Sequence, residues 1–99
     1  AAVYDHGNVS GGVYISGNYG SMQTMVINGD TTLNFNNMSE GDLVTCQVKG
    51  GGNYTLAIGG TQEWLTAKPT AIDSGKFAVI SIANYDASGN LIVAWKDEV

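Results

Sequence analysis

Hydrophobic and polar residues alternate along short stretches of this chain, and glycine or asparagine separates one stretch from the next. Leu33 and Phe35, for example, lie two positions apart and share one side of a pleated strand, whereas Thr32 and Asn34 point to the other side. Such stretches recur at intervals of about eight to twelve residues, the spacing typical of an all-β sandwich or barrel. The predicted strands are residues 12–16, 22–27, 31–35, 43–49, 53–58, 76–84 and 90–95. The expected fold is an all-β, antiparallel β-sandwich, jelly-roll-like, with about seven to eight strands.

Three connections are predicted to be hairpins. Asn28 and Gly29 both tolerate positive φ and suit a type I′ turn. Residues 49–53, "KGGGN", join two alternating stretches, and residues 85–90, "YDASGN", close the last pair with Gly89 in the left-handed position. The segment "TQEWLTAK" contains good helix formers but is short and ends at Pro69, so we expect a loop with at most one helical turn.

The alternation also predicts the core and a second apolar surface. Val44, Cys46 and Val48 share one side of their strand, so Cys46 is predicted to be a buried, unreactive thiol. It is the only cysteine, so an intrachain disulfide is impossible. The strands at 76–84 and 90–95 are apolar on both sides. A strand of this kind lies between two layers or is covered by another subunit, which predicts a homo-oligomer, and we expect a homotrimer.

Length and charge narrow the possible functions. The 99 residues suit one domain, residues 1–99, and the opening without methionine predicts a piece of a longer protein. Nine acidic residues stand against four lysines, and there is no arginine, so a nucleic-acid partner is disfavoured. No apolar run approaches the length of a membrane span, so membrane insertion is not expected.

No arrangement of side chains predicts catalysis or a cofactor. His6 is the only histidine and lies in a glycine-flanked terminal segment, where a solvated side chain is expected; one His and one Cys do not make a zinc site. Glu40 and Asp42, with Asp30 one strand away, could be imagined as an oxygen cage for calcium. Asp86, Ser88 and Asn90 occupy every second position, as the ligands of a calcium-binding loop do. We interpret both groups as solvated turn residues and predict no metal site.

Aromatic residues are the remaining means of recognition. Tyrosines such as Tyr14 and Tyr54, and the tryptophans, could stack on sugar rings, although Tyr54 and Trp95 are assigned to the core by their alternation. Trp64 and Tyr19 are less well explained by a strand pattern. The predicted ligand-binding residues are therefore Trp64, Glu63 and Tyr19. The alternative for Trp64 is that its indole folds back to plug one end of the core.

The order of several motifs resembles a β-domain of tailed-bacteriophage virion proteins, among them head fibres and tail fibres. The segments "GNVSGGVYI", "MVINGDTTLNFNNMSEGDLVTCQVKGGGNYTLAI" and "KFAVISIANYDASGNLIVAW" carry the resemblance, which covers residues 7 to 95. The loop "GGTQEWLTAKPT" departs from it, with Glu63 and Leu65 where the family tends to have a glycine-proline stretch. The matching positions are Gly29, Thr31, Thr32, Leu33, Phe35, Asn37, Thr55, Leu56, Trp64, Pro69, Tyr85, Asp86 and Gly89.

This resemblance implies a structural domain on the surface of a phage particle, commonly in trimeric assemblies with other virion proteins. The expected function is a non-enzymatic fibre or decoration module that presents loops for attachment to the host surface, where a bacterial surface glycan is one possible partner. One alternative is a carbohydrate-binding module of a secreted bacterial protein, which needs exposed aromatic residues along one sheet face. A small hydrolase is a second alternative and needs two carboxylates that converge in a cleft.

Overall fold

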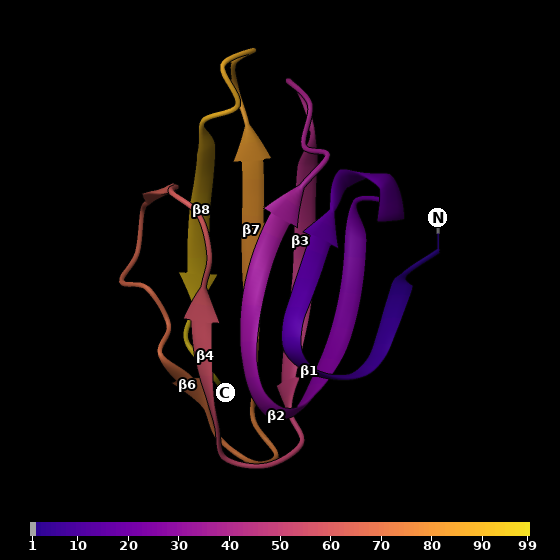
Figure 1. Cartoon of the computed structure of the whole chain (residues 1–99), viewed down its shortest axis with the longest axis vertical. Helices are drawn as coiled ribbons and strands as arrows, with labels where there is room; N and C mark the ends of the chain where they lie inside the picture. The colour runs from indigo at the N-terminus through magenta and orange to yellow at the C-terminus, as the bar shows by residue number, and fades with distance from the viewer. Residues whose placement is uncertain (1) are drawn as a thin grey trace.

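The computed structural model describes residues 2–99, which form eight strands and one short 3-10 helix (Figure 1). Within residues 2–99 there is no helix that is long enough and apolar enough to span a membrane. The elements in chain order are β1 (Tyr4–Ser16), η1 (Gly17–Tyr19), β2 (Met22–Asn36), β3 (Leu43–Gly50), β4 (Tyr54–Ile58), β5 (Glu63–Trp64), β6 (Ala71–Ile72), β7 (Phe77–Asn84) and β8 (Leu91–Lys96).

Strands β1 and β2 are both bent into a U, and the two are nested in parallel (Figure 1). The first half of β1 pairs with the first half of β2 from Tyr4 opposite Gln23, and the second halves pair up to Ser16 opposite Asn36. The register between β1 and β2 shifts within the bend of β1. Gly11 lies in this bend with a φ of +67°, a conformation that favours glycine. The bend of β2 lies close by, since a Cβ atom on Gly29 would come within 3.0 Å of the Ser10 Cβ.

The remaining strands extend this nested pair to both sides. β3 pairs in parallel with the first half of β2, and β4 pairs in parallel with its second half. Next to β3 come β7 and β8 in antiparallel order, β5 lies parallel to β8, and β6 lies antiparallel to β4. The path is β5-β8-β7-β3-β2-β4-β6, with β1 on β2. The result is one mixed sheet that curls into a half-barrel (Figure 1).

The all-β class is confirmed, but the predicted antiparallel pairing is wrong for much of the sheet, and a jelly-roll-like sandwich is not confirmed. The hairpin at Asn28-Gly29 is also wrong, because β2 runs through both residues and neither has a positive φ. Residues 49–53 form no hairpin either, since β3 and β4 both pair with β2 instead of with each other. The last hairpin is confirmed, with Gly89 at a φ of +83°. The prediction missed β5, β6 and the first half of β1.

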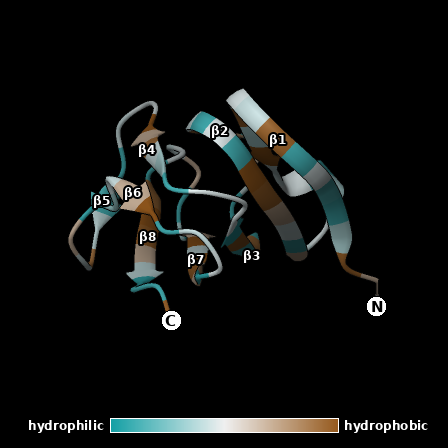
Figure 2. Cartoon of the chain, turned by 90° about the horizontal axis from the view of Figure 1, so that it is seen from below, coloured by the Kyte–Doolittle hydropathy of each residue, from teal (hydrophilic) through white to brown (hydrophobic). Residues whose placement is uncertain are grey.

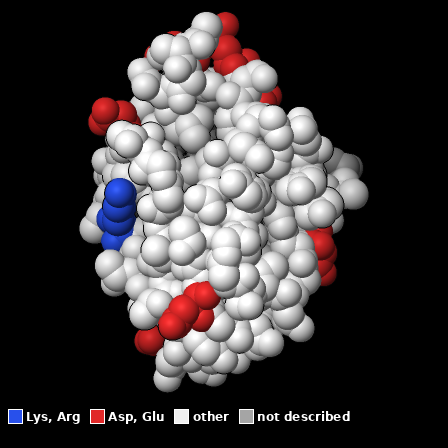
Figure 3. All heavy atoms as spheres, viewed as in Figure 1, with Lys and Arg blue, Asp and Glu red and all other residues white. Residues whose placement is uncertain are grey.

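The curl of the sheet creates two outer surfaces. Figure 2, seen from below, shows β3, β7 and β8 on one side of the half-barrel and β4 on the other, and the bent strands β1 and β2 connect the two sides. In this view β2 carries one continuous hydrophobic band, with hydrophilic residues at its upper end. Figure 3 looks onto the outside of β4 and of the second halves of β1 and β2, where charged side chains lie towards the rim and the middle is uncharged.

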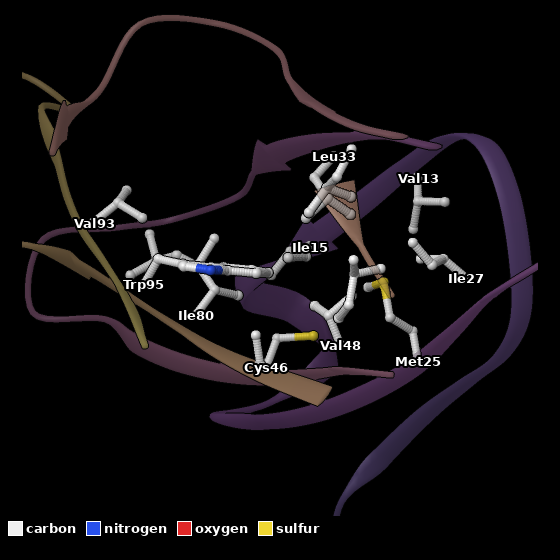
Figure 4. Close-up of a cluster of buried hydrophobic side chains, with 14 of the residues drawn as sticks. Val13, Ile15, Met25, Ile27, Leu33, Cys46, Val48, Ile80, Val93 and Trp95 are labelled. Carbon is white, nitrogen blue, oxygen red and sulfur yellow. The ribbon is translucent and has the colours of Figure 1, made fainter. Parts of the chain in front are cut away.

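The core fills the inside of the half-barrel (Figure 4). The prediction that Val44, Cys46 and Val48 face inward is confirmed, because their side chains are 1% exposed or less. Trp95 is buried as expected, and Tyr54 packs against the core while half-buried. The buried apolar side chains are Val13, Ile15, Met25, Ile27, Leu33, Val44, Cys46, Val48, Leu56, Ile72, Ala78, Ile80, Ile82, Val93 and Trp95.

Candidate functional site

Trp64 lies in the two-residue strand β5, beside the exposed side chain of Glu63. The strand pairs with β8, with Trp64 opposite Val93, and the Leu65 amide donates to the Val93 carbonyl at 2.9 Å. The indole is half-buried and packs against the core, and its Nε1 donates to Gln62 Oε1 at 3.4 Å. This geometry supports the alternative in which the indole closes one edge of the core.

Tyr19 lies in η1, between β1 and β2, and belongs to an aromatic cluster. Its ring stacks on Tyr4 with centroids 4.3 Å apart, and His6 meets both rings edge-on. The prediction of a solvated His6 is wrong, because its ring is half-buried and its Nε2 lies 2.8 Å from Gln23 Oε1. Gln23 is buried and donates through Nε2 to the carbonyls of Ser16 and Gly20. Trp64 lies in the edge strand β5, whereas Tyr19 lies between β1 and β2, and the strands β8, β7 and β3 separate the two places in the sheet.

Three of the acidic residues that the sequence offers as calcium ligands accept hydrogen bonds from groups of the chain itself. Asp42 Oδ2 accepts from the Ser39 amide at 2.8 Å, whereas Asp30 Oδ1 accepts from the Thr55 amide on β4. Asp86 accepts from both the hydroxyl and the amide of Ser88, and these hydrogen bonds lower the pKa of its carboxyl. Within residues 2–99 no cluster of three or more His, Cys, Asp or Glu side chains could hold a metal ion.

The outside of β3, β7, β8 and the first half of β2 forms a continuous surface that we call the apolar face. The register places Met22, Thr45, Ser81 and Ala94 in one row across the four strands. Lys49 and Lys96 lie towards one end of these strands. Met22 and Leu43 are more than half exposed, at 53% and 57%. The apolar members are Met22, Val26, Leu43, Phe77, Val79, Ala83, Ile92 and Ala94.

The opposite outer surface, formed by β4 and the second halves of β1 and β2, is polar and uncharged in its middle (Figure 3). Tyr14 and Asn34 lie opposite each other in the register, and Gly59 lies on the far side of Asn34. Tyr14 is 53% exposed. Together with Gln62 from the segment after β4, these residues line a groove of about 380 Å³, which we call the Tyr14 groove.

The groove was only partly visible in the sequence. Tyr14 was among the aromatic residues considered for sugar stacking, and the alternation with Val13 and Ile15 marks it as outward-facing. No sequence pattern predicts that Asn34 and Gln62 lie next to Tyr14, because the three residues belong to different segments of the chain. No protein-family model, curated protein or solved structure matches this chain. The two outer surfaces are therefore the features of the chain that bear on its function.

Proposed function

We propose that this chain is a non-enzymatic structural module on the surface of a bacteriophage particle, of the head-fibre or tail-fibre type, that assembles as a homotrimer. Copies pack through the apolar face, and the opposite polar surface and the end loops are presented to the host. The module needs no cofactor.

The observation that carries this proposal is the apolar face itself. Leu43, Ala83 and Ile92 form a row across three strands, and their side chains are exposed or half-buried although the opposite sides of these strands already contact the core. Contiguous exposed apolar surface in a small domain marks an interaction site. A second copy of the chain supplies an equally apolar surface, and a closed ring of copies covers all such faces.

The test is the oligomeric state of two matched variants, measured by size-exclusion chromatography with light scattering. Leu43→Lys places a charge on the apolar face, and Thr55→Lys places the same charge on the exposed outside of β4. We expect the wild-type chain and Thr55→Lys to be trimers at micromolar concentration and Leu43→Lys to be a monomer. A monomeric wild-type chain contradicts the proposal.

A second candidate function is a carbohydrate-binding module of a secreted bacterial protein. The exposed Tyr14 on an uncharged polar surface favours it, because aromatic rings with amide side chains are typical of ligand sites with a few fixed polar groups. A monomer that binds a polysaccharide would support this second function over the first.

A further inference from the structure

The Tyr14 groove has a fixed polar wall. The Gln62 carboxamide donates through Nε2 to the Gly59 carbonyl at 2.6 Å and accepts at Oε1 from the Trp64 indole at 3.4 Å. These two bonds hold the orientation of the side chain and leave one N–H of Nε2 free. Trp64 therefore acts on the groove as a positioning residue through Gln62.

A second amide completes the wall. The Asn34 carboxamide lies in the space that a side chain at position 59 would occupy, because a Cβ on Gly59 would collide with Asn34 Oδ1. This carboxamide is half-buried, and within residues 2–99 no side-chain polar atom is both fully buried and without a partner, so its donors and acceptor remain accessible to a ligand. Glycine at position 59 therefore leaves the room that this carboxamide occupies.

The groove also has an apolar part. Tyr14 presents a ring that is about half exposed, and the half-buried side chains of Phe35 and Leu91 line the same hollow. An aromatic ring combined with amide donors and acceptors suits a ligand that has C–H faces and hydroxyl edges. The volume of about 380 Å³ lies within the range of small-molecule sites.

The charge of the groove decides between classes of ligand. None of its lining residues is charged, and charged side chains lie away from the middle of this surface (Figure 3). A site without a cation offers nothing to compensate a carboxylate, phosphate or sulfate as it loses water. From this geometry we infer that the Tyr14 groove binds a neutral saccharide, with Tyr14 against a sugar ring and Asn34 and Gln62 bonded to its hydroxyls.

This inference deepens the host-recognition part of the proposed function, but it does not depend on trimer formation. Titration of the ¹⁵N-labelled chain with chitotriose, maltotriose and laminaritriose tests it by NMR. We expect at least one of these neutral probes to shift the backbone amides of Tyr14, Asn34 and residues 59–62. Trigalacturonate, which carries a carboxylate on every ring, serves as an anionic comparator, and an uncharged glycine-serine peptide serves as a non-sugar comparator. Neither is expected to shift these amides.

The variants Tyr14→Ala and Asn34→Ala should weaken binding by about tenfold or more, the scale of loss at central contacts. Tyr85→Ala is the matched control, because this tyrosine is 77% exposed and lies outside the groove. The inference is overturned if no neutral probe shifts the groove amides at about 10 mM, if Tyr14→Ala binds as well as wild type, or if only a comparator binds.

The monomeric Leu43→Lys variant separates the two proposals. If it binds the saccharide, the groove functions without assembly; if the wild-type trimer forms without binding, the groove inference alone fails.

Discussion

The Trp64 indole Nε1 donates to Gln62 Oε1 at 3.4 Å, while the ring itself packs against the core. One residue therefore joins the edge of the core to the wall of the Tyr14 groove. The exposed neighbour Glu63 takes no part in this link. A substitution at Trp64 is expected to affect both stability and the orientation of Gln62.

Trp64→Ala should lower the free energy of unfolding by about 2–4 kcal/mol, somewhat less than a fully buried tryptophan would, because the indole is half-buried. Trp64→Phe keeps an aromatic ring against the core but loses the N–H donor and part of the ring system, so its stability should lie between that of Trp64→Ala and wild type. Urea denaturation followed by circular dichroism measures both variants. A Trp64→Ala variant as stable as wild type would show that the indole does not support the core.

The Cys46 thiol is predicted to react with an alkylating reagent only after unfolding, because its side chain is 0% exposed. Mass spectrometry after iodoacetamide treatment in native buffer and in denaturant checks this. Cys46→Ser should also lower the free energy of unfolding by about 1–3 kcal/mol, since the thiol contacts the Gln47 carbonyl at 3.8 Å, a distance too long for a hydroxyl hydrogen bond. Fast alkylation of the native chain would contradict the inward orientation of this strand.

The same thiol makes stability depend on alkaline pH. Burial raises the pKa of Cys46 from 9.0 to about 12, so the native thiol keeps its proton where the unfolded thiol loses it. The contribution of the protonated thiol to the free energy of unfolding is fully present below pH 9.0, and it is lost progressively between pH 9.0 and about 12. Tyrosines and lysines titrate in the same range, so Cys46→Ala is the control. The wild-type chain should lose more stability than this variant between these pH values, and equal losses would refute the assignment.

Gln23 is the buried centre of the polar contacts beneath the aromatic cluster. Its side chain bonds to His6 and to the carbonyls of Ser16 and Gly20. Gln23→Leu should lower the free energy of unfolding by about 1–3 kcal/mol, because these groups lose their partner in a site shielded from water. Gln47→Leu, in a half-buried position on the apolar face, is the matched control and should cost less. Thermal unfolding compares the two variants.

Alternation along single strands could be interpreted without the structure because it depends on the local pleat. The inward side of residues 43–49, the burial of Trp95 and the open apolar side of residues 76–84 all follow from a period of two residues. The turn at residues 85–90 was predicted for the same local reason. By contrast, two-residue strands such as β5 and β6 are too short to show any period.

Strand pairing was decided only by the tertiary structure. Asn28-Gly29 has the composition of a hairpin turn, yet β2 continues through it, because its two halves find separate partners in β3 and β4. The Tyr14 groove has the same origin: parallel nesting of β1 on β2 sets Tyr14 opposite Asn34, and the chain after β4 brings Gln62 to them. Local sequence determines which side of a strand is apolar, whereas pairing depends on contacts between distant segments and on the entropy of closing the loops between them.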